Sequence, residues 1–224
     1  MKIEAVTVCV DYSHYLSKVL SNKDKLDRWV IVTHESDKDT IQLCIDNDIE
    51  YVCSKKIFKN AKFAKGKAIN EGLNILGRND WILHLDVDQK LPKNFRKLIC
   101  QQNLIKNNLY GAYRYAEWGQ KYPPTKLVLK KGKNGNGRIE KKIYLPIGYF
   151  QLWHSSVRKN YEENSDNTLM DDYLFLLGWY DLSCSVAEFK SKLIMIDGLN
   201  LIDVSGIVGT ERGHFVGIRN LKQK

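Results

Sequence analysis

Short apolar runs alternate with amphipathic stretches through the first half of the chain. The apolar runs have the length of buried strands, and the stretches between them place their apolar residues at helical spacing. This alternation is typical of βαβ units and predicts an α/β fold with a mixed, mostly parallel sheet flanked by helices. The predicted strands are 3–10, 29–33, 50–53 and 81–85, and the predicted helices are 15–20, 39–47 and 64–76.

The second half of the chain is less regular. Pro92 suits the first turn of a further predicted helix, where its missing N–H costs nothing. Residues 193–219 are rich in glycine and lack helical periodicity, so we expect them to wrap over a site rather than build the core. The remaining predicted elements are a strand at Tyr110–Trp118, a loop or hairpin at 120–142, a strand at Ile147–Trp153 and a helix at Leu169–Tyr180.

The composition is that of a globular protein. With 224 residues, 43% hydrophobic and 27% charged, the chain can bury a sizeable core, and we expect a single domain over residues 1–224. The amino terminus lacks a secretory signal, and no stretch approaches the roughly 20 apolar residues of a membrane span. We therefore expect a cytoplasmic protein without a transmembrane segment.

The formal net charge of +9 suggests an anionic partner, such as nucleic acid, a membrane surface or a phosphorylated substrate. Lysine and asparagine are abundant while arginine is sparse, a bias that an AT-rich coding sequence would also produce. The Lys- and Gly-rich run at 130–138 could follow a phosphate backbone or could simply be a solvated loop. The charge alone leaves both interpretations open.

Two carboxylates, Asp86 and Asp88, follow the predicted strand at 81–85. Ligands of α/β sheets bind where strands end at the carboxyl edge, so both side chains should face a crevice. Residues two apart point to the same side, which lets both converge on Mg²⁺ or Mn²⁺. Such a metal would stabilise the charge of a departing nucleoside diphosphate. An Asp-x-Asp turn is also common at solvated strand ends, so its surroundings decide its meaning.

Those surroundings resemble the GT-A glycosyltransferases, particularly the family-2-like group. The resemblance rests on the segments 5–12, 29–37, 63–72 and 81–92 in this order, and 63–72 looks like the family's Lys-Gly-x-Ala-x-Asn-x-Gly segment. It implies a nucleotide-sugar-binding half at 1–118 and an acceptor-binding half at 119–224, which contains the Lys/Gly-rich loop at 120–142. Basic charge and small size would suit a phage DNA-modifying type.

The resemblance also implies residue roles. The ends of the first two strands would border the nucleoside, and Lys65 or Lys67 would lie near the diphosphate, with a solvated helix face as the alternative. Asn70 would lie near the ribose or the strand edge, Asp86 would approach the ribose or the metal, and Asp88 would bind the metal. The implied nucleotide-sugar residues are Val10, Asp11, Tyr12, Thr33, Glu35, Lys65, Lys67, Asn70, Asp86 and Val87.

An inverting transferase needs a general base, which this family places at the start of a helix beyond the acceptor region. Asp171 and Asp172 occupy that place. Thr168 and Asp171 fit a capping box, in which Asp171 would stabilise the helix N-terminus. We therefore favour Asp172 as the base, with Asp171 and Asp166 as the alternatives.

The remaining site residues are a third metal ligand and the acceptor contacts. The resemblance implies a ligand, commonly a histidine, from the C-terminal part, where His214 is the candidate and Glu188 the alternative. The aromatic density of 147–154 suits stacking of sugars or bases and makes Gln151, Trp153 and His154 the acceptor candidates.

These features predict a metal-dependent, inverting glycosyltransferase that takes Mn²⁺ or Mg²⁺. The donor would be a nucleoside-diphosphate sugar, with UDP-sugar first, and the acceptor hydroxyl would belong to a hydroxymethylated DNA base or to a cell-surface glycan. A nucleotidyltransferase usually has a glycine-rich loop after its first strand, and residues 11–14 contain no glycine. A non-catalytic nucleic-acid-binding module is the alternative from a different class.

Overall fold

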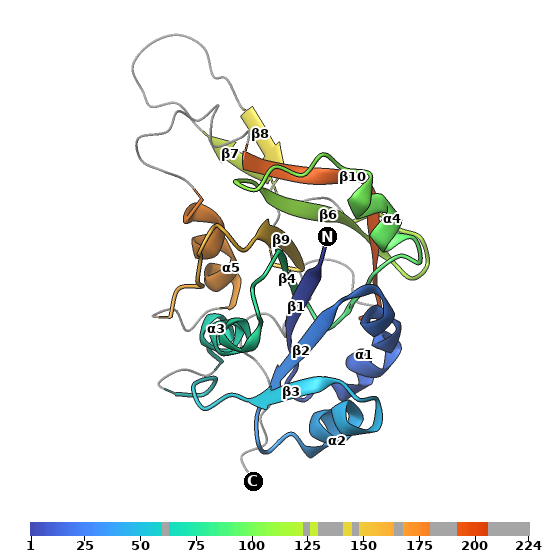
Figure 1. The fold of residues 1–224 in the computed structure, drawn as a ribbon, viewed down its shortest axis with the longest axis vertical. Helices are drawn as coiled ribbons and strands as arrows, with labels where there is room; N and C mark the ends of the chain where they lie inside the picture. Colours follow the sequence, from blue (N-terminus) through green and yellow to red (C-terminus); the bar gives the residue numbers. More distant parts are fainter. Residues whose placement is uncertain are drawn as a thin grey trace.

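The computed structural model is an α/β structure built on one large sheet (Figure 1). The structure describes residues 1–59, 63–122, 126–129, 141–144, 148–163, 168–179 and 192–205. The strands in these ranges are β1 (Ile3–Val8), β2 (Arg28–Thr33), β3 (Glu50–Cys53), β4 (Trp81–Leu85), β5 (Gln89–Lys90), β6 (Leu109–Ala116), β7 (Lys126–Leu129), β8 (Lys141–Tyr144), β9 (Phe150–His154) and β10 (Leu193–Asp203). The helices are α1 (Ser13–Lys18), the 3₁₀ helix η1 (Leu20–Lys25), α2 (Lys38–Asp46), α3 (Lys65–Ile75), α4 (Phe95–Cys100) and α5 (Thr168–Leu177).

Eight of the described strands form a sheet of order β3-β2-β1-β4-β9-β6-β10-β5, and β7 pairs with β8 in a separate antiparallel hairpin. The pairings β1–β2, β1–β4, β2–β3 and β6–β10 are parallel, whereas β9 runs antiparallel between β4 and β6. The prediction of a mixed, mostly parallel sheet is therefore confirmed. Because β9 reverses direction, β6 and β10 run the same way as β1, β2 and β4. The carboxyl ends of these five strands meet at one edge.

Helices cover both faces of the sheet (Figure 1). Apolar residues of α1, α2 and α4 pack with one face of the central strands, and those of α3 and α5 pack with the other. Both faces of β1 and β4 are therefore buried, which explains why their sequences are nearly continuous apolar runs.

The small-residue face predicted for the helix at 64–76 is what lets α3 approach the sheet closely. A Cβ on Gly72 would lie 2.4 Å from Cγ2 of Val6 and 2.6 Å from Cγ2 of Val32. Ala68 on the same face is fully buried. This close approach positions the N-terminus of α3 at the carboxyl edge of the sheet, beside the end of β4.

Two sequence expectations are corrected. Residues 193–203 do not wrap over a site, because they form β10, which pairs with β6 and β5 inside the sheet. An irregularity between Met195 and Asn200 shifts the register, and this shift obscured the strand pattern. The proline also falls outside its predicted position: α4 begins at Phe95, whose N–H donates to the Pro92 carbonyl, so Pro92 precedes the helix.

No helix in the described residues is long and apolar enough to cross a membrane.

Candidate active site at the carboxyl edge of the sheet

The loop after β4 is held in place by hydrogen bonds from three other segments. The Asp86 N–H donates to the Tyr149 carbonyl at 3.1 Å, and the Val204 N–H donates to the Asp88 carbonyl at 2.9 Å. The buried Asn22 amide donates to the Gln89 carbonyl at 2.8 Å and accepts from the Leu91 N–H at 2.9 Å. The backbone that carries Asp86 and Asp88 is therefore fixed by η1, by the segment before β9 and by the end of β10.

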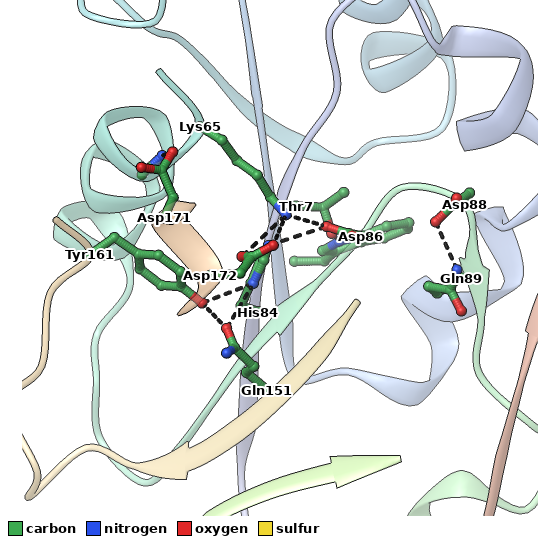
Figure 2. A network of polar contacts seen from close by, with 12 residues as sticks. Thr7, Lys65, His84, Asp86, Asp88, Gln89, Gln151, Tyr161, Asp171 and Asp172 are labelled. Carbon is green, nitrogen blue, oxygen red and sulfur yellow. Dashed lines mark hydrogen bonds and ion pairs between the residues drawn. The ribbon is translucent and has the colours of Figure 1, made fainter. Parts of the chain in front are cut away.

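One lysine lies between two aspartates at this edge (Figure 2). Lys65 Nζ, from the first turn of α3, lies 2.9 Å from Oδ1 of Asp86 and 3.0 Å from Oδ2 of Asp172. Asp172 comes from α5, and all three side chains are largely buried. The contact therefore joins two helices and the loop after β4, which are far apart in sequence.

Burial and charge set the protonation states of this triad. Burial lowers the pKa of Lys65, but Asp172 and Asp86 outweigh it and raise the pKa above its ordinary value, so the ammonium is retained. Burial raises the pKa of Asp86, yet the Lys65 ammonium outweighs it and the carboxylate stays ionised. The pKa of Asp172 is raised, because burial and the nearby Asp86 charge exceed the effect of Lys65. Asp172 is thus the one carboxylate of the triad that binds a proton more readily than usual.

Asp171 caps the neighbouring helix. Its Oδ2 accepts a hydrogen bond of 2.9 Å from the Gly66 N–H, which lies in the first turn of α3. Ala64, the N-cap of α3, supplies no side-chain bond of its own. The sequence assigned Asp171 to capping, and the structure shows that the helix it caps is α3, the helix that carries Lys65.

A glycine makes room for the Asp172 carboxylate. Gly148 has a φ of +69°, and a Cβ there would lie 2.6 Å from Oδ2 of Asp172. Only glycine combines this left-handed backbone with so close an approach. Gly148 therefore borders the carboxylate with backbone alone.

A buried polar cluster lies beneath the triad (Figure 2). The Tyr161 hydroxyl lies 2.9 Å from Nδ1 of His84 and donates to Oε1 of Gln151, while His84 Nε2 lies 3.5 Å from Oδ1 of Asp86. The Tyr161 ring stacks on Phe175 of α5, with centroids 4.1 Å apart. These groups support Asp86 and α5 from the interior of the sheet.

A second group of charges surrounds Asp88. Gln89 donates to its Oδ1 at 2.8 Å, and Asp203, at the end of β10, pairs in the sheet with Gln89. Burial, Asp203 and Asp86 together raise the pKa of Asp88 to about 7. Arg114 of β6 lies 3.4 Å from Oδ2 of Asp203 and neutralises part of this charge.

The residues around Asp88 suit a hard divalent cation in part. Among the described residues, no three His, Cys, Asp or Glu side chains are arranged to hold a metal ion. Burial is the main cause of the raised pKa of Asp88, and the charges of Asp203 and Asp86 add to it; a divalent cation would neutralise these charges. Asp88 is the first candidate ligand and Asp203 the second, because Lys65 pairs with Asp86 at 2.9 Å, whereas Arg114 lies 3.4 Å from Asp203.

The predicted nucleoside residues lie at the ends of β1 and β2. Val10 is buried, and Asp11 has a φ of +58° with its N–H donating 2.7 Å to Oδ2 of Asp37. Thr33 donates to the same oxygen at 3.2 Å, and Asp37 also caps α2 through the Thr40 N–H. Asp37 therefore ties the two strand ends together. The two other predicted nucleoside residues also lie at these strand ends. Tyr12 is the N-cap of α1, and Glu35 is exposed in the turn after β2.

Two predicted cofactor residues on α3 point elsewhere. Lys67 Nζ donates to the Lys59 carbonyl at 3.3 Å, away from the triad. Asn70 has the hydrogen-bond partner that its burial required, but the partner is Tyr161: the amide donates to the Tyr161 carbonyl at 2.9 Å and accepts from its N–H at 2.8 Å. Asn70 therefore anchors the segment after β9, and this geometry does not support a ribose contact. Val87 is buried in the core between the two aspartates.

The three acceptor candidates on β9 are buried. Gln151 belongs to the cluster beneath Asp86, and Trp153 packs on Phe175 with ring centroids 5.0 Å apart. His154 pairs with Trp81, at the start of β4, so it lies at the opposite edge of the sheet from Asp86. The geometry does not support acceptor contacts by these residues, because aromatic density also marks core strands.

Several predicted residues lie outside the described residues. They are His214 and Glu188, the candidates for the third metal ligand, Asp166, the alternative base, and the Lys-rich run at 130–138.

Sequence reasoning missed Asp37, Asp203, Arg114 and the buried cluster of His84 and Tyr161. Asp203 lies at the carboxyl end of a strand, which is the criterion that singled out Asp86. It was missed because residues 193–203 were not predicted to form a strand. His84 interrupts an apolar run directly before Asp86, a signal of a buried polar contact. No local signal identified Arg114.

The fold and the site together define an α/β protein with charged residues gathered at the carboxyl edge of its sheet. No protein-family model and no curated protein matches the chain. Solved structures match it distantly. Glucosyl-3-phosphoglycerate synthase from Mycobacterium tuberculosis, in complex with Mn²⁺, uridine diphosphate and glucosyl-3-phosphoglycerate, has 14% sequence identity and a TM-score of 0.39, covering 50% of this chain and 44% of that chain.

Mannosyl-3-phosphoglycerate synthase from Rubrobacter xylanophilus has 14% identity and a TM-score of 0.40, covering 52% of this chain and 41% of that chain. The matched part thus spans less than half the length of either synthase. The similarity concerns the fold of about half of this chain.

Proposed function

We propose that this protein is a metal-dependent glycosyltransferase that moves a sugar from a nucleoside-diphosphate sugar, foremost a UDP-sugar, to an acceptor hydroxyl with inversion. The observation that carries the proposal is the Lys65 ammonium held between Asp86 and Asp172 at the carboxyl edge of the sheet. A cation for the diphosphate and a carboxylate with a raised pKa for the acceptor proton are the two groups that this transfer needs within one site.

Asp172 is the general base of the proposed reaction. It takes the proton of the acceptor hydroxyl, whose oxygen attacks the anomeric carbon. The bond from that carbon to the β-phosphate oxygen breaks, and its electron pair stays on the diphosphate. Burial, the largest influence on Asp172, raises its pKa towards the range of a working base.

Lys65 links the two halves of this step. Once Asp172 is protonated, the ammonium faces one carboxylate charge instead of two and is free to neutralise the leaving diphosphate. Asp88, with Asp203 beside it, would hold Mn²⁺ or Mg²⁺, which supplies Lewis-acid stabilisation of the diphosphate when bound. Asp86 and the loops after β1 and β2 would border the nucleoside.

Two acceptor classes suit this site. A hydroxymethylated base in DNA would suit the net charge of +9, and a glycan would suit the fold equally well. Both acceptors present a hydroxyl group to Asp172.

A thermal-shift panel tests the proposal. UDP-, GDP- and dTDP-sugars are added with and without Mn²⁺, and a ligand present at about 100 times its Kd stabilises by about 2.7 kcal/mol. We expect one nucleotide class to raise the Tm, and to do so only with the metal. No stabilisation by any donor with Mn²⁺ would contradict the proposal.

Matched variants assign the roles. Asp88→Asn should abolish the metal-dependent part of the shift. Asp172→Asn should keep donor binding and lose transfer to acceptor by roughly 100-fold or more. Asp46→Asn, on the exposed face of α2, is the control and should change neither.

A further inference from the structure

The strand β6 continues past the edge of the sheet into a tight turn. The Ala116 N–H donates to the Gln120 carbonyl at 2.8 Å, and the Gly119 N–H donates to the Ala116 carbonyl at 2.9 Å. Gly119 has a φ of +89°, which closes the turn, and Tyr115 forms an antiparallel bridge with Lys121. Residues 116–122, here called the Trp118 turn, are therefore an ordered projection rather than a loose loop.

The Trp118 turn begins beside the candidate active site. Ala116 pairs with Asp203 in the parallel ladder between β6 and β10, and Asp203 pairs with Gln89. Asp203 is also a main cause of the raised pKa of Asp88. The turn thus starts one strand away from the carboxylates that would hold the donor and its metal.

Trp118 is the exposed tryptophan of this chain. Its side chain is 54% exposed, whereas Trp29, Trp81, Trp153 and Trp179 are all buried, and these five are all the tryptophans of the sequence. The indole N–H donates to Oε1 of Gln120 at 3.3 Å. The hydrogen-bonded turn thus holds a flat apolar ring in water, on which a ligand ring can stack.

The described cations of this segment contact a carboxylate and aromatic rings. Arg114 pairs with Asp203 and stacks on Tyr122 and Tyr149, with 4.5 and 4.7 Å to the ring centroids. Lys121 lies over Tyr113 at 4.4 Å. Glu117 is exposed in the turn itself. Within the described residues 114–122, the two cations are therefore engaged by a carboxylate and by aromatic rings, and this segment does not present the cluster of free cations that tracks a nucleic-acid backbone.

We propose that the Trp118 turn is the acceptor-docking surface and that it takes an uncharged saccharide, whose apolar ring face stacks on the indole. This inference rests on the proposed transferase function and names its acceptor class. The turn supplies the exposed aromatic surface beside the site, a role that the buried aromatic residues of β9 do not fill.

Quenching of tryptophan fluorescence by iodide tests this directly. Iodide reaches exposed indoles, and most of the fluorescence that it can quench comes from Trp118. The probes are neutral gluco-, manno-, galacto- and N-acetylglucosamine tetrasaccharides, and a 20-base-pair DNA duplex, all without donor. We expect at least one tetrasaccharide to protect Trp118 from iodide while the duplex does not. Trp118→Ala should weaken binding of that saccharide, measured by calorimetry, by roughly tenfold or more, and Trp118→Tyr should recover part of it.

Ile105→Ala is the matched control. Ile105 is 58% exposed and precedes the start of β6, whereas the Trp118 turn follows its end. This variant should leave saccharide affinity unchanged. Protection by the duplex alone, or by no probe at all, would overturn the inference. If a donor raises the Tm but no saccharide protects Trp118 from iodide, the docking surface alone is refuted. If a saccharide protects Trp118 but no donor raises the Tm, the transferase function is refuted.

Discussion

At the residue scale, the central feature is that Lys65 and Lys67, two residues apart on one helix, have different environments. Lys65 is buried between two carboxylates, and Lys67 lies on the surface of α3 and binds a backbone carbonyl. Removing one member of a buried ion pair leaves an uncompensated charge, which is costly, whereas a surface contact contributes little.

Lys65→Met should therefore destabilise the protein by about 3 kcal/mol or more, as expected for a broken buried pair. Lys67→Met, the matched control, should change the free energy of unfolding by less than about 0.5 kcal/mol. Urea unfolding at pH 7 measures both. Adding Asp172→Asn to Lys65→Met should restore part of the loss, because it removes one of the two stranded carboxylates. Equal effects of the two lysine variants would show that the triad is not a buried ion pair.

At the element scale, one carboxylate ties together the start of β1 and α4. Oδ2 of Asp27 accepts from the Ile3 N–H at 2.7 Å and from Nη1 of Arg96 at 2.7 Å. Burial raises the pKa of Asp27, but these donors outweigh it and hold the pKa below 3.8. A lowered pKa means that the stabilisation is present above 3.8 and is lost as the pH falls through the folded-state value.

Asp27→Asn should therefore lower the Tm at pH 7, and the difference from the unmodified chain should shrink below pH 3.8. Thermal unfolding followed by circular dichroism across this pH range measures it. The exposed neighbour Asp24, changed to Asn, provides the control and should show no such pH-dependent difference. A constant difference at every pH would mean that Asp27 acts through packing rather than charge.

At the scale of the whole molecule, the strand order sets where the sheet is most stable. Strand β1 is hydrogen-bonded to β2 on one side and β4 on the other, whereas β3 has β2 as its partner at one end of the strand order. Amides in doubly paired, buried strands open only with the most costly unfolding events.

Hydrogen exchange should accordingly be slowest in β1 and β4 and at least about tenfold faster in β3. Mass spectrometry of peptides covering Ile3–Val8 and Glu50–Cys53 measures the contrast. Comparable protection of the two strands would contradict the strand order.

The sequence by itself determined the elements whose pattern is local. The periodicity placed β1 to β4, α2 and α3 within a few residues, and it placed Asp86 and Asp88 at a strand end, because side-chain spacing of two or 3.6 is a property of neighbouring residues. The small-residue face of α3 was visible for the same reason.

Only the tertiary structure decided which charged groups meet. That Lys65 rather than Lys67 contacts Asp172, that Asp171 caps α3, and that Asp203 lies beside Asp88 all depend on contacts between residues distant in sequence. Burial was equally invisible locally, since the aromatic strand β9 is core whereas Trp118 is exposed. Local periodicity specifies which face of an element is apolar, but the chain must fold before that face is covered and the charges at the sheet edge acquire their partners.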